Sequence, residues 1–359
     1  MSDIHSSSRM VSPSTGEMSE GQRGSSLPIA MFVYNRVDNT QKTIEHLLAN
    51  TLAKEAELFV FSDGGKNEES WKAVNEVRRY LHSIKETVDK TGALKSMTII
   101  ERPENFYLER NITEGIAQVF QTYDRIIVLE DDICTSPYYL QYMNDAFEMY
   151  KDIPKVMHIA GFTNLHLMDQ KIKGGPISRM VSPSTGEMSE GQRGSFSFYF
   201  TPHMSGWGWG TWRDRWQKHF IHYKSRAEAL EGMTAEDQDA IQYGGVFPCL
   251  KSLDKDPIPW DICWEIAIYK AGGLCLTPAQ TMVRNIGLKN GTHFRSFDII
   301  QHYEFDREPS QTPLHLSRVE NPEKNPQIES LFAEAITDWG IRYTPFGKVV
   351  RFIYKAFKK

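Results

Sequence analysis

The chain has 359 residues, of which 40% are hydrophobic and 24% are charged, a composition typical of a globular protein with a sizeable buried core. Its formal net charge of -5 argues against a general nucleic-acid binder, which carries a clear basic excess, so we expect no nucleic-acid partner. The four cysteines form no CxxC pair, and no apolar stretch approaches the roughly 20 residues that span a bilayer. We therefore expect a cytoplasmic location, either free or peripheral on the inner face of the membrane.

From Pro28 onward, short apolar runs alternate with segments of helical spacing. Buried parallel strands appear as short continuous apolar runs, whereas amphipathic helices repeat their apolar residues every three or four positions. This alternation predicts βαβ units and therefore an α/β fold with a mostly parallel sheet flanked by helices. The expected strands are Ile29–Tyr34, Glu57–Ser62, Met97–Glu101, Arg125–Glu130 and Val156–Ala160, and the expected helices lie around Thr40–Asn50, Trp71–Leu81, Ile112–Phe120 and Tyr139–Tyr150.

Polar residues follow three of these strands at the point where each strand ends. Arg36 follows the first strand, Asp63 follows the second, and the triplet Glu130-Asp131-Asp132 ends the fourth. Ligands of open parallel sheets bind outside the carboxyl ends of the strands, so we expect these side chains to share one site. The alternatives are a surface salt bridge for Arg36 and a turn residue for Asp63, because Asp-Gly is common turn chemistry.

The acidic triplet also indicates a metal site. Three adjacent carboxylates repel one another unless a cation lies among them, and their hard oxygen atoms suit Mn²⁺ or Mg²⁺. Such an ion would neutralise a departing nucleoside diphosphate. A solvated acidic turn is the alternative, although the position directly after the apolar run Ile126–Leu129 favours the metal.

Several motifs, taken in order, resemble those of GT-A glycosyltransferases. VLEDDICTSPYYLQYMNDA is similar to the EDD form of their acidic motif, in particular that of N-acetylglucosaminyltransferase I and related bacterial family 2-like sugar transferases. PIAMFVYNR, FSDGG, RPENFYLERNITEGI, FYFTPHMSGWGWGTW, PWDICW and NIGLKNGTHF extend the resemblance from Pro28 to about Phe294. The resemblance implies a GT-A, Rossmann-like nucleotide-binding fold. It also implies inverting transfer of a sugar, such as N-acetylglucosamine, from a metal-bound UDP-sugar donor to an acceptor hydroxyl.

The resemblance further implies roles for residues on the donor side. Glu130 and Asp131 correspond to positions that contact the donor ribose and sugar, and Asp132 corresponds to the direct metal ligand. Asp63 resembles the uracil-binding aspartate, and Arg36 resembles a basic residue near the nucleotide and diphosphate. Two further candidates for holding the nucleotide open the helix beside the acidic strand, Arg110 and Asn111.

The acceptor side is expected in the stretch Phe196–Trp216, where glycines separate tryptophans. Flat aromatic rings suit sugar rings, and glycine permits close approach of the backbone. Trp207 and Trp209 are therefore candidates for the sugar or acceptor pocket. Because the two residues alternate in the strand sense, the alternative is that one of them belongs to the core.

Asp261 is the candidate general base, lying between the apolar residues Trp260 and Ile262. Apolar surroundings raise the pKa of a carboxyl group, and a carboxylate in such a place can remove a proton from an attacking hydroxyl. In the resembled family the corresponding acid is the base of an inverting displacement. Glu265, one helical turn later, is the competing candidate, and an N-cap or a buried salt bridge is the structural alternative for Asp261.

Three further features lie towards the ends of the chain or in its loops. His293, in a glycine-broken loop, is a candidate contact of the metal or diphosphate, as a late histidine is in many GT-A enzymes. Residues Phe346–Phe357 would place apolar and basic side chains on opposite helix faces, which suits either a membrane surface or docking on the protein itself. The segment Ser8–Ser25 recurs unchanged at Ser178–Ser195 and has no core-forming pattern.

These features predict five segments. They are a disordered N-terminal tail at 1–26, a nucleotide-sugar-binding half at 27–165, a mobile loop at 166–195, an acceptor and catalytic half at 196–300, and a C-terminal region at 301–359 that ends in a basic amphipathic helix.

Two other functions remain as alternatives. A nucleotidyltransferase would share the fold and the acidic site, but YNRVDNTQ lacks the glycine-rich loop usual after the first strand of that class.

A non-catalytic carbohydrate-binding protein is the other alternative, and it would not need the full set Asp63, Asp131, Asp132 and Asp261. We therefore expect a glycosyltransferase of the hexosyltransferase type. Its acceptor would be a carbohydrate or lipid-linked molecule in surface polysaccharide or glycolipid synthesis.

Overall fold

The computed structural model describes residues 26–163, 165, 197–245, 247, 249–287, 306–326 and 328–334. Nearly all of the expected N-terminal tail lies outside these residues, as do both copies of the duplicated segment, His293 and the C-terminal amphipathic helix. Within the described part of the chain, every helix is too short or too polar to cross a membrane.

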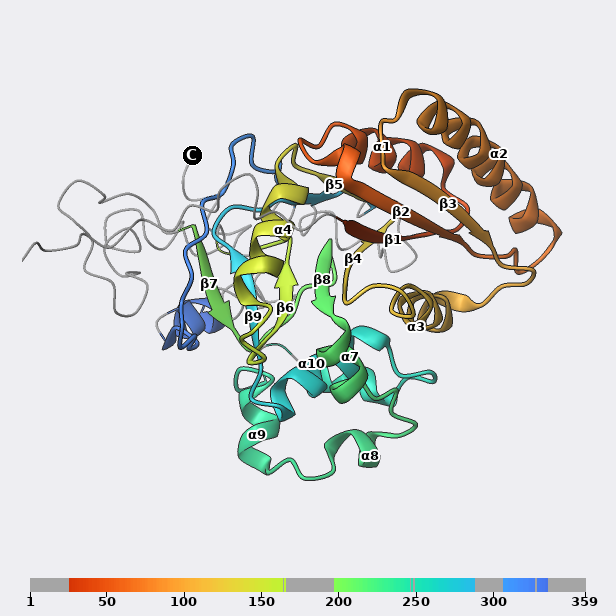
Figure 1. Cartoon of the computed structure of the whole chain (residues 1–359). Helices are drawn as coiled ribbons and strands as arrows, with labels where there is room; N and C mark the ends of the chain where they lie inside the picture. The colour runs from red at the N-terminus through yellow and green to blue at the C-terminus, as the bar shows by residue number, and fades with distance from the viewer. Residues whose placement is uncertain are drawn as a thin grey trace, which may run out of the picture.

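An eight-stranded sheet forms the centre of the described structure, in the order β3-β2-β1-β4-β8-β6-β9-β7 (Figure 1). Neighbouring strands run parallel except where β8 pairs with β4 and β6, and where β7 pairs with β9. The expected mostly parallel α/β sheet is therefore confirmed. The strands are β1 (Leu27–Val33), β2 (Ala56–Ser62), β3 (Ser96–Glu101), β4 (Arg125–Glu130), β6 (Val156–Ala160), β7 (Phe198–Thr201), β8 (Trp209–Trp212) and β9 (Leu274–Pro278).

Helices cover both faces of this sheet, because strands such as β4 carry apolar side chains on both faces. Alternate side chains of a strand point to opposite faces, so Ile127 and Leu129 join one hydrophobic cluster while Ile126 and Val128 join another. The first cluster includes α1 (Val37–Leu48), α2 (Glu68–Thr91) and α4 (Tyr139–Tyr150), and the second includes α3 (Tyr107–Val119) and α10 (Trp260–Lys270).

A third, smaller cluster packs α10 against a group of short helices, most of which lie below α10 in Figure 1. Its buried residues include Tyr223, Ile241 and Leu253. The short elements around it are α7 (Arg213–His219), α8 (Arg226–Leu230), α9 (Ala235–Ala240) and the 3-10 helix Cys249–Asp254. We retain as a proposal the division into a donor half and an acceptor half, although strands of both halves pair in the one sheet.

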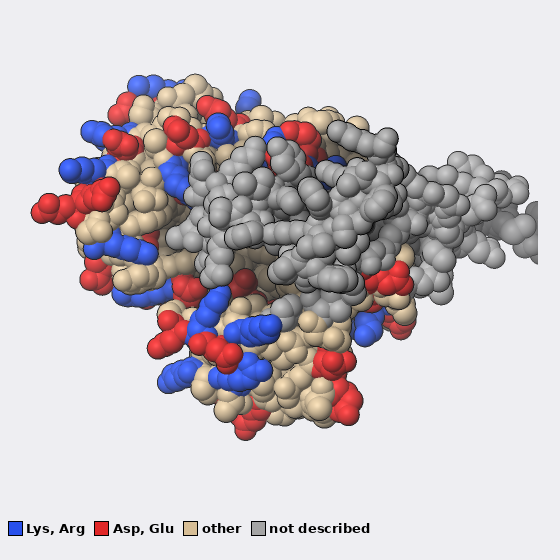
Figure 2. All heavy atoms as spheres, turned by 180° about the vertical axis from the view of Figure 1, so that it is seen from behind, with Lys and Arg blue, Asp and Glu red and all other residues tan. Residues whose placement is uncertain are grey.

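The register of the sheet brings the expected polar residues to one edge. Phe32 of β1 is paired with Glu130 of β4, and the amide of Asp63 donates to the carbonyl of Val33 at 3.0 Å. A separate two-stranded ribbon, formed by β5 (Ile133–Thr135) and β10 (Val283–Asn285), returns the later chain to the acidic triplet. On the described part of the face in Figure 2, basic side chains are mixed with acidic ones.

Gly210 of β8 lies where a larger residue would collide with the neighbouring helix. A Cβ atom there would lie 2.6 Å from the Met143 and Phe147 side chains and 2.9 Å from the Ile126 carbonyl oxygen, which is fixed in β4. We therefore expect Gly210→Ala to lower the free energy of unfolding by about 1–3 kcal/mol, measured by urea titration. Gly206→Ala is the control, because its Cβ would meet Trp260 at an ordinary 3.6 Å. Equal losses in both variants would contradict this packing.

Candidate active site

The centre of the site is the acidic triplet at the carboxyl end of β4. Asp131 and Asp132 are only 3% and 8% exposed. The Arg36 guanidinium forms an ion pair with Asp131, to which its Nε also donates at 3.3 Å, and its Nη2 lies 2.8 Å from Asp132 Oδ2. The hydroxyl of Thr43 in α1 donates to the Asp131 carbonyl at 2.9 Å, so the first helix fixes the same turn. One guanidinium therefore bridges two buried carboxylates.

The carboxyl groups of this cluster hold more negative charge than Arg36 offsets. The pKa of Glu130 is raised to about 8, first by burial and then by the charges of Asp132 and Asp131, which outweigh the lowering effect of Arg36. Burial likewise raises the pKa of Asp131 to about 6, against the lowering effect of Arg36. The Arg36 pKa is itself raised, because the two aspartates outweigh its own burial. The site would therefore be stabilised by a further positive charge.

The donor set fits a hard divalent cation. Asp131 and Asp132 present carboxylate oxygens, which Mn²⁺ and Mg²⁺ prefer, and such ions commonly take their remaining ligands from phosphates and water. Within the described ranges, no three His, Cys, Asp or Glu side chains form a ready-made metal cage. Gly287 lies directly against Asp132 and Arg36, since a Cβ atom there would overlap the Asp132 carboxylate and lie 2.9 Å from Arg36 Nη1. Only glycine therefore fits at this position without disturbing the contact between Arg36 and Asp132.

Asp63 lies at the neighbouring strand end, as expected, but its oxygens already bind the protein. Oδ1 accepts from the amides of Gly64 at 2.9 Å and Phe106 at 2.7 Å, while Oδ2 accepts from the Asn105 amide group at 3.2 Å. Burial raises the Asp63 pKa despite these hydrogen bonds. The turn role anticipated for Asp63 is therefore present, and contact with a nucleobase stays a proposal.

The two helix residues expected near the nucleotide differ in their surroundings. Asn111 is buried and accepts from Arg102 Nε at 3.0 Å, whereas Arg110 is exposed and pairs with Glu114 at 2.8 Å. Arg110 also lies over the Phe106 ring at 3.6 Å. These contacts leave the nucleotide role of both residues a prediction.

Arg102 is a further candidate residue of the nucleotide site that the sequence did not lead us to expect. Its guanidinium lies over the rings of Phe61 and Phe106, and its Nη2 is buried without a hydrogen-bond partner. Burial lowers its pKa, while the charges of Glu114 and Asp63 act in the opposite direction. The signal was available, because Arg102 directly follows β3 just as Asp63 follows β2.

Asp261 lies in the first turn of α10. Its Oδ1 accepts from the Ile262 amide at 2.9 Å, and burial raises its pKa, with the charges of Glu109 and Glu265 adding to the effect. The charge of Asp261 also raises the pKa of Glu130. The structure thus brings the candidate base and the candidate donor cluster within electrostatic reach of each other.

Glu265, the competing base candidate, is held by two contacts. Its Oε1 lies 2.6 Å from His203 Nδ1 and its Oε2 accepts from the Met204 amide at 2.8 Å, with the side chain almost fully buried. A carboxylate engaged at both oxygens has an anchoring role first. These contacts favour Asp261 as the base.

The two tryptophans expected in the acceptor pocket have different positions. Trp207 is half-buried and packs edge-on against Phe162, with ring centroids 4.5 Å apart. Trp209 is 0% exposed and stacks between His158 and Trp260 at centroid distances of 5.2 and 5.1 Å. Trp209 is therefore a core residue, and its predicted place in the pocket is wrong. Trp209 is the first residue of β8 and its ring covers a face of the sheet, whereas Trp207 precedes the strand.

Glu130→Gln should stabilise the metal-free protein increasingly as the pH rises. The folded-state pKa is raised to about 8 from 4.5, so the folded protein holds this proton longer than the unfolded chain does. Wild-type stability is consequently lost as the pH rises through this window, and glutamine avoids that loss. In chelator, the difference in Tm should grow in favour of the variant between about pH 5 and pH 8. Glu86→Gln on the surface of α2 is the control, and a pH-independent difference for Glu130→Gln would contradict the assignment.

Comparisons with known proteins agree with this architecture. Residues 29–200 match the model of glycosyl transferase family 2. Among curated proteins no significant match is found. Solved structures similar to the chain include the mannosyltransferase PcManGT from Pyrobaculum calidifontis in complex with GDP-Man and Mn²⁺, at 10% identity and a TM-score of 0.36 over 68% of this chain and 73% of that one.

Two further similar structures hold different nucleotide-sugars. TarS 1–349 of S. aureus in complex with UDP-GlcNAc shares 12% identity at a TM-score of 0.28, over 38% of this chain and 33% of that one. A UDP-glucose pyrophosphorylase complexed with UDP-glucose shares 8% identity at a TM-score of 0.35, over 70% and 90%. These scores are too low to distinguish one activity from another, so the family match carries the conclusion. The match of residues 29–200 to glycosyl transferase family 2 identifies the protein as a glycosyltransferase, and its mostly parallel sheet has the α/β architecture of the GT-A fold.

Proposed function

We propose that the protein transfers a sugar from a UDP-sugar to an acceptor hydroxyl by an inverting displacement that depends on Mn²⁺ or Mg²⁺. The observation that carries the proposal is the under-compensated carboxylate cluster at the end of β4, bridged by Arg36 and within electrostatic reach of Asp261. N-acetylglucosamine as the sugar, and surface polysaccharide or glycolipid as the product, come from the sequence resemblance. Peripheral membrane contact rests on the C-terminal segment, outside the described residues.

On the donor side, the residues of the cluster would bind and orient the nucleotide-sugar. Asp132, with Asp131 beside it, would hold the ion, whose charge offsets the diphosphate as it departs. Arg36 would turn from the aspartates to the diphosphate, because a guanidinium is suited to bidentate contact with phosphate oxygens. Asp63 and Arg102, at the ends of β2 and β3, would border the nucleoside.

On the acceptor side, Asp261 would act as the general base. The acceptor oxygen attacks the anomeric carbon, its proton passes to the Asp261 carboxylate, and the bond from that carbon to the diphosphate oxygen breaks with inversion. The raised pKa of Asp261 makes it a stronger base than an ordinary aspartate. The carboxylates of the triplet are poorly placed for this task, because they lie on the donor side.

The family match favours this function over nucleotidyl transfer and over non-catalytic carbohydrate binding. A donor screen that measures nucleoside diphosphate release with Mn²⁺ tests it directly. A nucleotidyltransferase would instead release pyrophosphate, and a binding protein would release neither product.

Asp132→Ala should remove the metal dependence of UDP binding. Wild-type protein should bind UDP at least about 10-fold more tightly with Mn²⁺ than with chelator, since the ion bridges carboxylate and diphosphate, whereas the variant should bind equally in both. Calorimetry measures both affinities. Asp124→Ala is the control, because Asp124 lies just before β4 and its side chain is 81% exposed. Equal wild-type affinity with and without metal would remove the metal site.

Asp261→Asn should lower kcat by about 10²–10⁴-fold while UDP-sugar affinity changes little, because the lost proton transfer belongs to the transition state. Wild-type kcat should rise as the pH rises through the raised pKa of Asp261, since only the deprotonated carboxyl accepts a proton. The variant should lack this rise. Asp254→Asn, at a side chain 68% exposed, is the control. If Glu265→Gln loses turnover and Asp261→Asn keeps it, the base is Glu265.

A further inference from the structure

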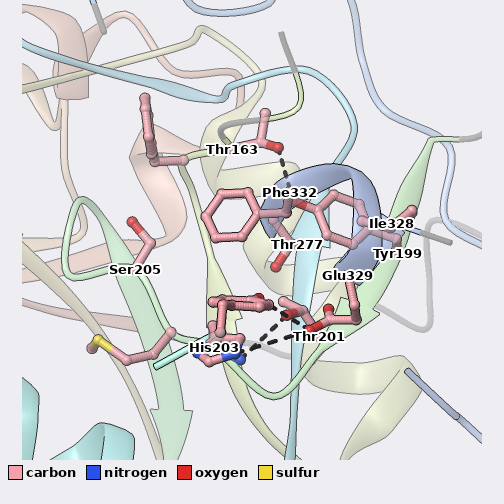
Figure 3. A pocket seen from close by; sticks show the side chains of 12 residues that line it. Thr163, Tyr199, Thr201, His203, Ser205, Thr277, Ile328, Glu329 and Phe332 are labelled. Carbon is pink, nitrogen blue, oxygen red and sulfur yellow. Dashed lines mark hydrogen bonds and ion pairs between the residues drawn. The ribbon is translucent and has the colours of Figure 1, made fainter. Parts of the chain in front are cut away.

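Four side chains from distant parts of the chain meet beside α10, and we name His203, Tyr243, Glu265 and Glu329 the acceptor-side clamp. Figure 3 shows two of them, His203 and Glu329, pointing toward each other. His203 Nδ1 lies 2.6 Å from Glu265, and His203 Nε2 lies 3.9 Å from Glu329 Oε2. The Tyr243 hydroxyl donates to the same Glu329 oxygen at 3.0 Å, and its ring lies 4.2 Å from the His203 ring. The clamp thus joins α10 to the helical residues 328–334.

Tyr243 adopts an unusual backbone conformation to reach this place. Its φ is 49°, and it precedes two glycines with φ of 67° and 83°. A bulky residue with positive φ is a strained outlier that persists only when its surroundings hold it. Here the surroundings include the Glu329 hydrogen bond and edge-on packing against Phe332 at 5.1 Å. The strain indicates that the position of this side chain is under constraint.

A second connection ties the same turn to α10. Trp264 donates its indole N–H to His158 Nδ1 at 3.3 Å, so the proton of the neutral ring lies on Nε2, which donates to the Ser205 carbonyl at 3.1 Å. Burial lowers the His158 pKa to about 3, which keeps the ring neutral. Residues 203–205 are therefore held by two successive residues of α10, by Glu265 directly and by Trp264 through His158. This turn leads directly to Trp207.

The cavity beside the clamp is too small to be a sugar site as it stands. Its volume is about 60 Å³, with walls that include Tyr199, Thr277 and Phe332. A cavity of about 150 Å³ is needed to hold benzene, so a saccharide ring does not fit here, although a few water molecules do. The cluster is therefore better explained by what it holds in place than by what it could bind.

We propose that the clamp positions the acceptor side of the active site. It fixes the turn that carries Trp207 against the helix that carries Asp261, and it makes this arrangement depend on the helical residues 328–334. The four residues would be positioning residues, since their contacts are with one another and with neighbouring groups of the protein. This inference rests on the proposed function, and it adds that chain beyond residue 300 is required for acceptor use.

Tyr243→Phe tests the proposal because it removes one hydroxyl and keeps the ring. Tyr269→Phe is the matched control, since the Tyr269 hydroxyl also donates to a carboxylate, Asp237, at 3.3 Å. Amide hydrogen exchange of Met204 and of residues 328–334 should speed up by about 10-fold in Tyr243→Phe alone, the loss expected for a hydrogen bond to a charged group. The KM for a p-nitrophenyl glycoside acceptor should rise by a similar factor, and the UDP-sugar KM by less than about 2-fold.

Unchanged exchange at Met204 and 328–334 in Tyr243→Phe would overturn the proposal, as would a donor KM that rises as much as the acceptor KM. Glu329→Gln provides a second variant of the same contact, and it should show the same exchange pattern. If wild-type protein releases no UDP from any UDP-sugar, the proposed function fails, and the exchange result alone then decides whether the clamp exists.

Discussion

The site depends on one electrostatic imbalance, in which a single guanidinium faces three carboxyl groups at the end of a buried strand. Arg36 bridges Asp131 and Asp132, while burial and mutual repulsion raise the pKa values of Glu130 and Asp131. Burying such groups destabilises a fold unless other contacts hold them. β1 supplies the parallel register, α1 binds the Asp131 carbonyl through Thr43, and the Ile286 amide donates to the Asp132 carbonyl at 2.9 Å.

This imbalance is the physical basis of the proposed phosphate-bearing ligand and divalent ion. The carboxylates would attract the cation, and the cation would in turn attract the diphosphate that the carboxylates alone would repel. In the proposed function, Arg36 would have two alternative partners, the aspartates in the free protein and phosphate oxygens in the complex. In the free protein, Arg36 would therefore offset only part of the negative charge of the buried carboxylates, and a cation could offset the rest.

Two acids on α10 show how environment divides roles between residues of one type. Asp261 and Glu265 are four residues apart and therefore share a helix face. Glu265 is enclosed by the His203 ring and the Met204 amide, so it holds the neighbouring turn. Asp261, at the start of the helix, accepts a hydrogen bond from the adjacent Ile262 amide, and burial raises its pKa. Separating an anchoring carboxylate from a proton-accepting one lets the helix serve both packing and the proposed chemistry.

The sequence by itself determined the alternating strands and helices, and the polar residues at the strand ends, because both have local signals. An apolar run such as Ile126–Leu129 marks a buried strand wherever it lies, and the residues after it must lie at the carboxyl edge of a parallel sheet. Only the tertiary structure decided that Trp209 is core and Trp207 is half-buried, and that Glu265 meets His203. It also placed Tyr243 against Glu329, 86 residues apart in the sequence. Such contacts join segments whose spacing carries no periodic signal, so they are settled by how the elements pack and not by any local pattern.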